Sequence, residues 1–290
     1  MNPNVVKTSR SQDYVKYGLV GVALVYLGLL LFLPALNIFV QAFGKGLTVF
    51  LQNFAKPAFL SALRLTLLLA LVAVPLNTVF GLCAAWAIAR KRFPGRTLLL
   101  SIIDLPFSIS PVVAGLMLVL LYGRTGWFAP LLTAWDFRVI FAFPGMVLAT
   151  IFVSLPFVVR EVIPVLEEMG HDQEEAAKTL GASDWQTFWW VTLPNIRWGV
   201  LYGVILTNAR AMGEFGAVAV VSGNISFQTQ SLPLFVEDAY KQYDTEAAYG
   251  AAALLALLAA VTLVLKELLE RKTNRVAGRL KALGQRHSSL

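Results

Sequence analysis

The sequence predicts an all-α integral membrane protein with six transmembrane helices. Its 290 residues are 57% hydrophobic and only 14% charged, whereas about a quarter of the residues in a soluble domain are charged. Six apolar runs are long enough to cross a bilayer, which takes about 20 helical residues. This apolar excess is too large for one buried core, and it fits a chain whose outer surface also faces lipid.

The six predicted spans cover 17–40, 60–89, 98–121, 143–163, 198–221 and 247–266. The first run is too long for the core of a signal peptide and has no convincing small-residue cleavage site, so we expect it to be retained. Several runs contain prolines that are expected to kink their helices: Pro75, Pro106, Pro111 and Pro156. In the third run, the segment 104–111 leaves two readings open: an irregular span, or a loop and helix entry before a shortened span.

The placement of the basic residues predicts the orientation of the chain. With both termini in the cytoplasm, 17 Lys and Arg residues fall on the inner segments and six on the outer ones. We therefore expect a cytoplasmic tail at 1–16, a six-span domain at 17–266 and a basic, solvated cytoplasmic tail at 267–290. These charges flank apolar runs without interleaved aromatic residues, so we expect contact with membrane lipid and none with nucleic acid. Cys83 lies within an apolar run and is expected to be a buried structural thiol.

A polar insert at 172–194 separates the fourth and fifth spans. Asp172 followed by Glu175 is a capping-box pattern that predicts a helix start, and Gly181 predicts its end. Ser183 followed three residues later by Gln186 predicts a second short helix, which carries apolar Trp185, Phe188 and Trp189 on one face and ends at Pro194. Such helices either lie on the membrane surface or enter a groove of a protein partner. The acidic start disfavours an anionic leaflet and favours the protein partner.

The fifth run contains two charged residues, Arg210 and Glu214, at a spacing that places them on one helix face. Charges at membrane depth usually pair and face the bundle interior. Two overlapping readings remain: a structural ion pair, or a face that borders a translocation path, with Arg210 meeting an anion. Gly213 and Gly216 are expected to permit close helix packing. Two readings are open for Ser222 and Asn224: they supply neutral donors at the outer mouth of the translocation path, or they cap the end of the helix.

The sequence offers no catalytic or metal-binding constellation. It contains no GxxxxGK[ST] phosphate loop, and its two histidines, His171 and His287, make a zinc site implausible. We therefore expect no catalytic residue, no metal and no cofactor. An ion-driven secondary transporter would often show inverted repeats, and a membrane enzyme would need a catalytic constellation, so both classes are disfavoured.

The residues Glu175-Ala-Ala, Gly181 and Val191-Thr-Leu-Pro194 resemble the EAA loop of ATP-binding-cassette (ABC) importer permeases. The one departure is Val191, where that family usually has Ile. The resemblance implies a type I ABC importer permease fold and a coupling helix that docks into a separate ATPase subunit. The residues it assigns to coupling, with the neighbouring aromatic residue, are Glu175, Ala176, Ala177, Gly181, Val191, Leu193, Pro194 and Trp185.

Further segments are similar to oxyanion permeases, and most of all to the W-type subunits of sulfate permeases. They are FPGR at 93–96, SPVVAG at 110–115, PFVVRE at 156–161, PNIRWGVLYG at 194–203, TNARAMGEFGAVAVVSG at 207–223 and SLPL at 231–234. This resemblance implies a non-catalytic subunit of a sulfate importer in a bacterial inner membrane. It also implies two copies of an ATPase, a homologous T-type permease subunit and a periplasmic sulfate-binding protein as partners. Thiosulfate as a further substrate, and molybdate or tungstate as alternative substrates, remain open.

Overall fold

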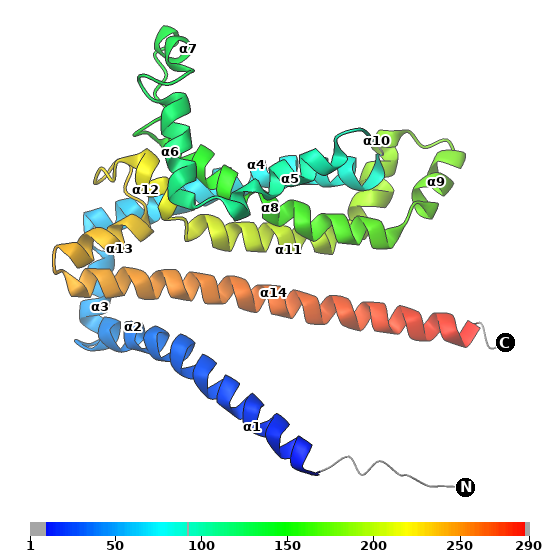
Figure 1. Ribbon diagram of the computed structural model, residues 1–290, viewed down its shortest axis with the longest axis horizontal. Helices are drawn as coiled ribbons and strands as arrows, with labels where there is room; N and C mark the ends of the chain where they lie inside the picture. The colour runs from blue at the N-terminus through cyan, green and yellow to red at the C-terminus, as the bar shows by residue number, and fades with distance from the viewer. Residues whose placement is uncertain (1–9, 92, 288–290) are drawn as a thin grey trace.

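The computed structural model describes residues 10–91 and 93–287, which form helices joined by turns and loops, with no strand among them (Figure 1). Most of the predicted tail at 1–16 lies outside these residues, as do residues 288–290. The helices are α1 (Arg10–Leu27), the π-helical turn η1 (Gly28–Phe32), α2 (Leu33–Phe43), α3 (Leu47–Phe54), α4 (Pro57–Arg90), α5 (Arg96–Ser108), α6 (Pro111–Tyr122), α7 (Ala129–Ala134), α8 (Phe143–Met169), α9 (Asp172–Thr179), α10 (Asp184–Thr187), the π-helical turn η2 (Phe188–Thr192), α11 (Leu193–Met212), α12 (Gly216–Ser222), α13 (Leu232–Lys241) and α14 (Thr245–His287).

The described helices supply up to six membrane spans. Four are single apolar helical stretches of sufficient length: Lys16–Phe43, Pro57–Arg90, Phe143–Met169 and Thr245–Leu268. Two more are helix pairs bent at a short break, α5 with α6 by 112° and the helix ending at Met212 with α12 by 53°. The six apolar runs are therefore all helical, but the third and fifth are broken. α14 continues as a helix well beyond the sixth predicted span.

The break in the third span lies at its middle, between Ser108 and Pro111. Proline lacks an N–H and disfavours helical geometry in the residue before it, and Ser110 is accordingly extended, with ψ of 135°. The apolar run is thus irregular, as one reading expects, and the short α6 is entered through a helix, α5, and not through a loop alone. The bend makes α6 and α7 project sideways from the other helices (Figure 1).

The centre of the bundle is α8. In its most apolar window 56% of the residues are buried, against 33% in α4 and none in the first span. One core cluster around Met146 joins α8 to α4, α12 and α13, and another around Val158 joins it to α4, α5 and α11. α8 therefore packs against helices on several sides and shares buried residues with both α4 and α11.

Glycines on α4 and α11 permit close approach to α8. A Cβ at Gly81 would lie 2.8 Å from Cβ of Val158, and one at Gly203 would lie 2.9 Å from the Val158 Cα. The expected packing role is confirmed for Gly216, where a Cβ would lie 2.9 Å from Pro111, but it is wrong for Gly213, which lies at the end of α11 close only to its own helix.

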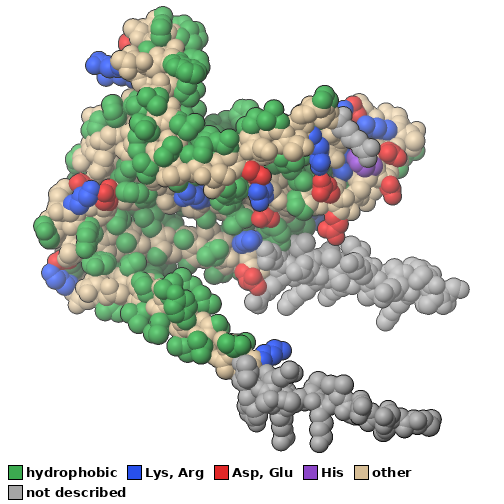
Figure 2. All heavy atoms as spheres, in the orientation of Figure 1, with side chains coloured by type: hydrophobic (Ala, Val, Ile, Leu, Met, Phe, Trp, Pro, Cys, Tyr) green, Lys and Arg blue, Asp and Glu red, His purple; other side chains and the backbone are tan. Residues whose placement is uncertain are grey.

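The outer faces of the helices are apolar, as lipid contact requires. The first span exposes most of its large side chains, and Figure 2 shows hydrophobic side chains over much of the bundle, with charges gathered towards the α9 end. The expectation that Cys83 is buried is wrong. On α4 it follows exposed Leu76, Val79 and Phe80 at helical spacing, and therefore lies on the outward face of that helix.

Replacement of Gly203 by leucine tests the packing of α11 on α8. The added side chain meets the Val158 backbone, which cannot yield as a flexible side chain does, so we expect a loss of about 1–3 kcal/mol in the free energy of unfolding. Gly21→Leu is the matched control, since no atom lies within 4 Å of a Cβ there. Thermal unfolding in detergent measures both variants, and equal midpoints for the two would contradict the proposed close contact.

Candidate functional site: the polar insert and the charged break

The insert is a helix, a tight turn and a second helix, as predicted. α9 leads through Gly181 into α10, η2 and α11, and together these elements form one end of the bundle (Figure 1). Exposed side chains dominate α9, which contains no fully buried residue. A helix held by so little apolar burial must be positioned by other contacts, and these are polar.

The start of α9 is where expected, but it is formed differently. Asp172 is the first helical residue, His171 occupies the cap position, and no side chain caps the helix, so the predicted capping box of Asp172 and Glu175 is wrong. The Glu175 N–H donates instead to the His171 carbonyl at 3.0 Å. Three acidic residues in the first turn remain favourable because they face the positive end of the helix dipole.

Gly181 ends α9 in the way that its sequence position predicts. Its φ is +89°, and the Gly181 and Ala182 N–H groups donate to the carbonyls of Lys178 (2.9 Å) and Ala177 (3.1 Å). This bonding is the Schellman arrangement, which satisfies carbonyls at a helix end. No atom lies within 4 Å of a Cβ built at Gly181, so glycine is required for its backbone conformation and not for space.

The second helix starts at the predicted capping box. The Gln186 N–H donates to Ser183 Oγ at 3.3 Å, and the Ser183 N–H donates to Gln186 Oε1 at 2.9 Å. The expected aromatic face is also present: the ring centre of Trp185 lies 6.3 Å from Phe188 and 5.5 Å from Trp189. Phe188 also contacts Trp86 of α4, so one side of the aromatic cluster rests on the bundle while Trp185 stays largely exposed.

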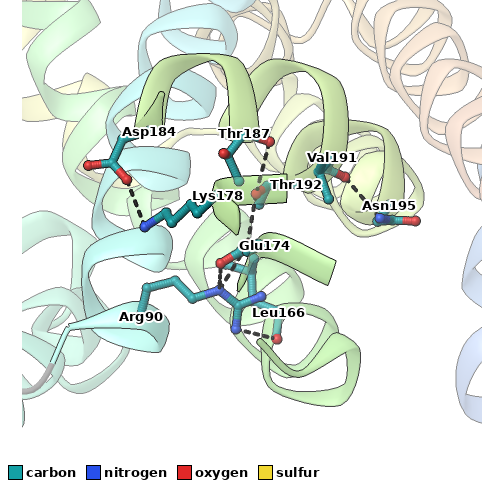
Figure 3. Close-up of polar contacts among 9 residues, drawn as sticks. All are labelled: Arg90, Leu166, Glu174, Lys178, Asp184, Thr187, Val191, Thr192 and Asn195. Atoms are coloured by element: carbon teal, nitrogen blue, oxygen red, sulfur yellow. Dashed lines mark hydrogen bonds and ion pairs between the residues drawn. The ribbon is translucent and has the colours of Figure 1, made fainter. Parts of the chain in front are cut away.

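Pro194 does not end this helix, contrary to the prediction. The helix continues from Asp184 to Met212 through the π-helical turn η2, in which the Leu193 N–H donates to the Phe188 carbonyl five residues earlier. The wider turn accommodates a proline at the start of α11, where its missing N–H costs little. Asn195 Nδ2 additionally donates to the Val191 carbonyl at 2.9 Å (Figure 3).

Most of the residues assigned to coupling lie on the accessible side of the insert. Glu175, Ala176, Gly181, Trp185 and Pro194 are exposed. The remaining three are partly buried: Ala177, Val191 and Leu193. Leu180, which precedes Gly181, is 88% exposed, so the turn presents an apolar side chain on the surface. The arrangement offers a partner a short acidic helix with small, apolar and aromatic side chains around it.

The opposite side of α9 holds a buried ion pair that the sequence reading missed. Arg90 Nε lies 3.0 Å from Glu174 Oε2, and the two side chains are only 5% and 12% exposed. Thr192 donates its hydroxyl to Glu174 Oε1 at 2.7 Å, and Arg90 Nη1 donates to the Leu166 carbonyl at 2.9 Å (Figure 3). The sequence did contain a clue to this pair: Arg90 is the last residue of a span, and Glu174 is a second acid directly before Glu175.

A second, exposed ion pair closes the turn of the insert. Lys178 Nζ lies 2.7 Å from Asp184 Oδ1, across Gly181 (Figure 3). The hydrogen bond between the two groups, followed by the attraction of their charges, raises the pKa of Lys178 and lowers the pKa of Asp184. Both groups thus stay charged at neutral pH, although solvent and salt weaken a pair in this position.

Arg210 and Glu214 form the predicted pair, but not on one helix face. α11 ends at Met212, and Glu214 lies in the break before α12. Arg210 Nη2 is 3.0 Å from Glu214 Oε2, with the arginine side chain 34% exposed and the glutamate 2%. Glu214 Oε1 accepts the Ala217 N–H at 3.0 Å, so the same carboxylate pairs with Arg210 and caps α12.

Ser222 and Asn224 cap the C-terminal end of α12. Ser222 is fully buried, its Oγ accepts the Asn224 N–H at 3.1 Å, and its carbonyl accepts the Thr229 hydroxyl at 2.7 Å. Asn224 has φ of +50°, the left-handed geometry typical of a turn after a helix. These contacts favour the capping reading over free donors. The helical rise along α11 separates the insert from Arg210 by about 26 Å.

Comparisons with known proteins agree with this geometry. Residues 77–275 match the family model described as "Binding-protein-dependent transport system inner membrane component". The chain is 67% identical to "Sulfate transport system permease protein CysW" of Synechocystis sp. over 89% of this chain and 94% of that protein. It is 40% identical to "Sulfate transport system permease protein CysT" of Escherichia coli over 84% of this chain and 88% of that protein.

Among solved structures, the protein resembles a chain of the "bacterial alginate ABC transporter in complex with alginate pentasaccharide-bound periplasmic protein". The TM-score is 0.73 at 18% sequence identity, over 92% of this chain and 96% of the other. Identity this low shows the fold alone. The predicted permease fold is thereby confirmed.

Replacement of Arg210 tests how far the structure depends on its pair. Arg210→Met leaves the buried Glu214 carboxylate without its cation, so we expect a loss on the order of 3 kcal/mol in the free energy of unfolding in detergent. Arg210→Met combined with Glu214→Gln should recover at least half of that loss, because the amide oxygen still accepts the Ala217 N–H. Lys241→Met, in the exposed pair with Glu237, is the control and should cost under about 0.5 kcal/mol. Glu214→Gln alone completes the cycle, and a double-variant loss equal to the sum of the two single losses would show that the two side chains are not coupled.

Proposed function

Because this chain belongs to the binding-protein-dependent transport system inner membrane component family, we propose that it is the W-type permease subunit of an ATP-driven sulfate importer. The observation that carries the proposal is the 67% identity, over nearly the full length of both chains, to a protein named for that role. Identity to a protein named as the T-type subunit is lower, at 40%, which supports the W-type over the T-type assignment.

The proposal assigns ATP hydrolysis to other chains. The sequence contains no GxxxxGK[ST] loop to hold the phosphates of ATP, so two copies of a separate ATPase would supply the energy. A homologous T-type permease subunit would complete the translocation path, and a periplasmic sulfate-binding protein would deliver the anion. The multi-pass chain would lie in a bacterial inner membrane with both termini and the insert in the cytoplasm, as the distribution of Lys and Arg favours.

In this proposal the insert is the part that the ATPase moves. The exposed side of α9 and α10, with Glu175, Ala176 and Trp185, docks in a groove of the ATPase, which suits a short helix with small and aromatic side chains. Gly181 gives the insert its sharp turn. α11 then runs unbroken from the insert to Arg210, so a displacement of the insert is passed along one rigid helix to the break.

The break is proposed to border the translocation path. Arg210 is partly exposed and already paired with Glu214, so its charge is reduced and it attracts a divalent anion without holding it tightly. Alternating access would follow from tilting of the spans as the ATPase dimer closes. With few cations at membrane depth, selectivity for sulfate is proposed to rest mainly on the binding protein.

Uptake of labelled anions tests the substrate. Cells that lack this chain should lose labelled sulfate uptake and keep labelled molybdate uptake, and the chain should restore sulfate uptake only when the partner ATPase is active. Loss of molybdate uptake alone would contradict the sulfate assignment and favour the molybdate or tungstate alternative. Sulfate uptake that persists with an inactive ATPase would contradict the ATP-driven class. Competition by thiosulfate tests whether that anion is also carried.

Gly181→Val tests the coupling role of the insert. Valine is strained at a φ of +89° and should displace α10 from α9, so we expect ATP-driven uptake to fall by at least about tenfold with normal membrane insertion. Asparagine tolerates this backbone geometry better, and Gly181→Asn should retain more activity. Gly46→Val is the control, since Gly46 has a φ of +93° with no neighbouring atom within 4 Å but precedes α3, away from the insert. An equal effect of both valines would count against a specific role for the insert.

A further inference from the structure

α9 is connected to its neighbouring helices through a glycine at each end. It joins α8 through Gly170 (φ +68°) and α10 through Gly181 (φ +89°), and neither glycine has an atom within 4 Å of a built Cβ. It also has no fully buried residue, so little apolar surface holds it against the spans. A force on its exposed side could therefore rotate α9 about its two ends and leave the spans in place, unless a further contact prevents it.

Gln173 of α9 accepts an exposed hydrogen bond from Asn195 Nδ2 at 2.7 Å, and Glu174 supplies the buried contact. It projects from the side of α9 that faces the bundle, and one carboxylate meets Arg90, the last residue of α4, and Thr192, in the turn that leads into α11 (Figure 3). Arg90 in turn donates to the Leu166 carbonyl in the last turns of α8. One buried group thus connects α9 to the ends of three long helices.

The burial of this pair favours a positioning role over a general gain in stability. Removing two charges from water costs nearly as much as their attraction returns, so a buried pair adds little net stability but strongly favours one arrangement of its partners. The nearby pair of Arg96 and Glu167 has the same chemistry at 3.2 Å, but its side chains are 43% and 54% exposed. That pair joins α5 to α8 without touching α9, and it is therefore a natural control.

We infer that Glu174 and Arg90 are positioning residues that form the strut between α9 and the spans, through which a displacement of the docked α9 reaches α4 and α8, in addition to the direct path along α11. This inference rests on the proposed function, since it assigns a role in coupling to residues outside the exposed docking side. The strut differs from that docking side, because Glu175, the next residue, points to solvent and is free to meet a partner. Two adjacent acidic residues would thus have separate tasks, Glu175 outward and Glu174 inward.

The test compares ATP hydrolysis with transport in the complete complex of both permease subunits, ATPase and binding protein in liposomes. Glu174→Gln keeps the size of the side chain and an acceptor for Thr192 but removes the charge. Glu174→Ala and Arg90→Ala each remove one half of the strut. We expect labelled sulfate taken up per ATP hydrolysed to fall at least about tenfold in both alanine variants and less in Glu174→Gln, with the double alanine variant no worse than either single one.

Arg96→Gln with Glu167→Gln should change this ratio less than about twofold, because an exposed pair contributes little. An unchanged ratio in all Glu174 and Arg90 variants, or hydrolysis and uptake that fall together with the amount of assembled complex, would overturn the inference. In either case the pair would be a structural contact only.

A second measurement is independent of the substrate. Amide hydrogen exchange in α9 should become at least about tenfold faster in Glu174→Gln, while exchange around Val158 in the core of α8 stays the same. Unchanged exchange in α9 would overturn the strut even if the variant failed in transport. Absence of ATP-driven sulfate uptake by the wild-type complex would instead contradict the proposed function, and the exchange result would still decide whether Glu174 holds α9.

Discussion

The requirement that buried backbone groups be hydrogen-bonded governs this structure more than any single contact. Inside a bilayer no water is available to an unpaired N–H or carbonyl, so the apolar runs must be helical wherever they face lipid. The two broken spans show how the chain leaves the helix at depth. At the first break Pro111 has no N–H to satisfy. At the second, the Glu214 carboxylate accepts the N–H of Ala217, which lies in the first turn of α12. At each break, a residue of the break itself therefore removes or satisfies a backbone N–H that would otherwise lack a partner.

The same requirement explains why one helix can connect two distant regions, the insert and the charged break. α11 begins at the π-helical turn of the insert and ends beside Arg210, about 26 Å away by its helical rise. A helix whose backbone bonds are all internal transmits a displacement along its axis without local unfolding. α8 supports it along this length, and Gly203 allows the two backbones to come close. The break after Met212 is the first place where such a displacement can change the angle between helices.

Sequence patterns predicted those features that are local in the chain. Six apolar runs, the capping box at Ser183 and the left-handed Gly181 each depend on residues a few positions apart, and the structure contains all of them. One local pattern failed, the capping box of Asp172 and Glu175. Other failures depended on three-dimensional context. The exposure of Cys83 follows from which face of α4 meets other helices, and Pro194 stays helical because a wider turn precedes it. Periodicity contains neither kind of information.

Sequence patterns also could not predict ion pairs between residues that are distant in the chain. Glu174 and Arg90 are 84 positions apart, and only the packing of α4 against α8 brings the end of one helix beside the insert. Arg210 and Glu214, four positions apart, were predictable as a pair, although not as residues on either side of a helix end. In both pairs the acid also accepts a further hydrogen bond, from Thr192 or from Ala217. An acid with two donors is fixed in position more firmly than its net contribution to stability suggests. The two buried carboxylates therefore mark the two points where irregular backbone joins the long helices of the bundle.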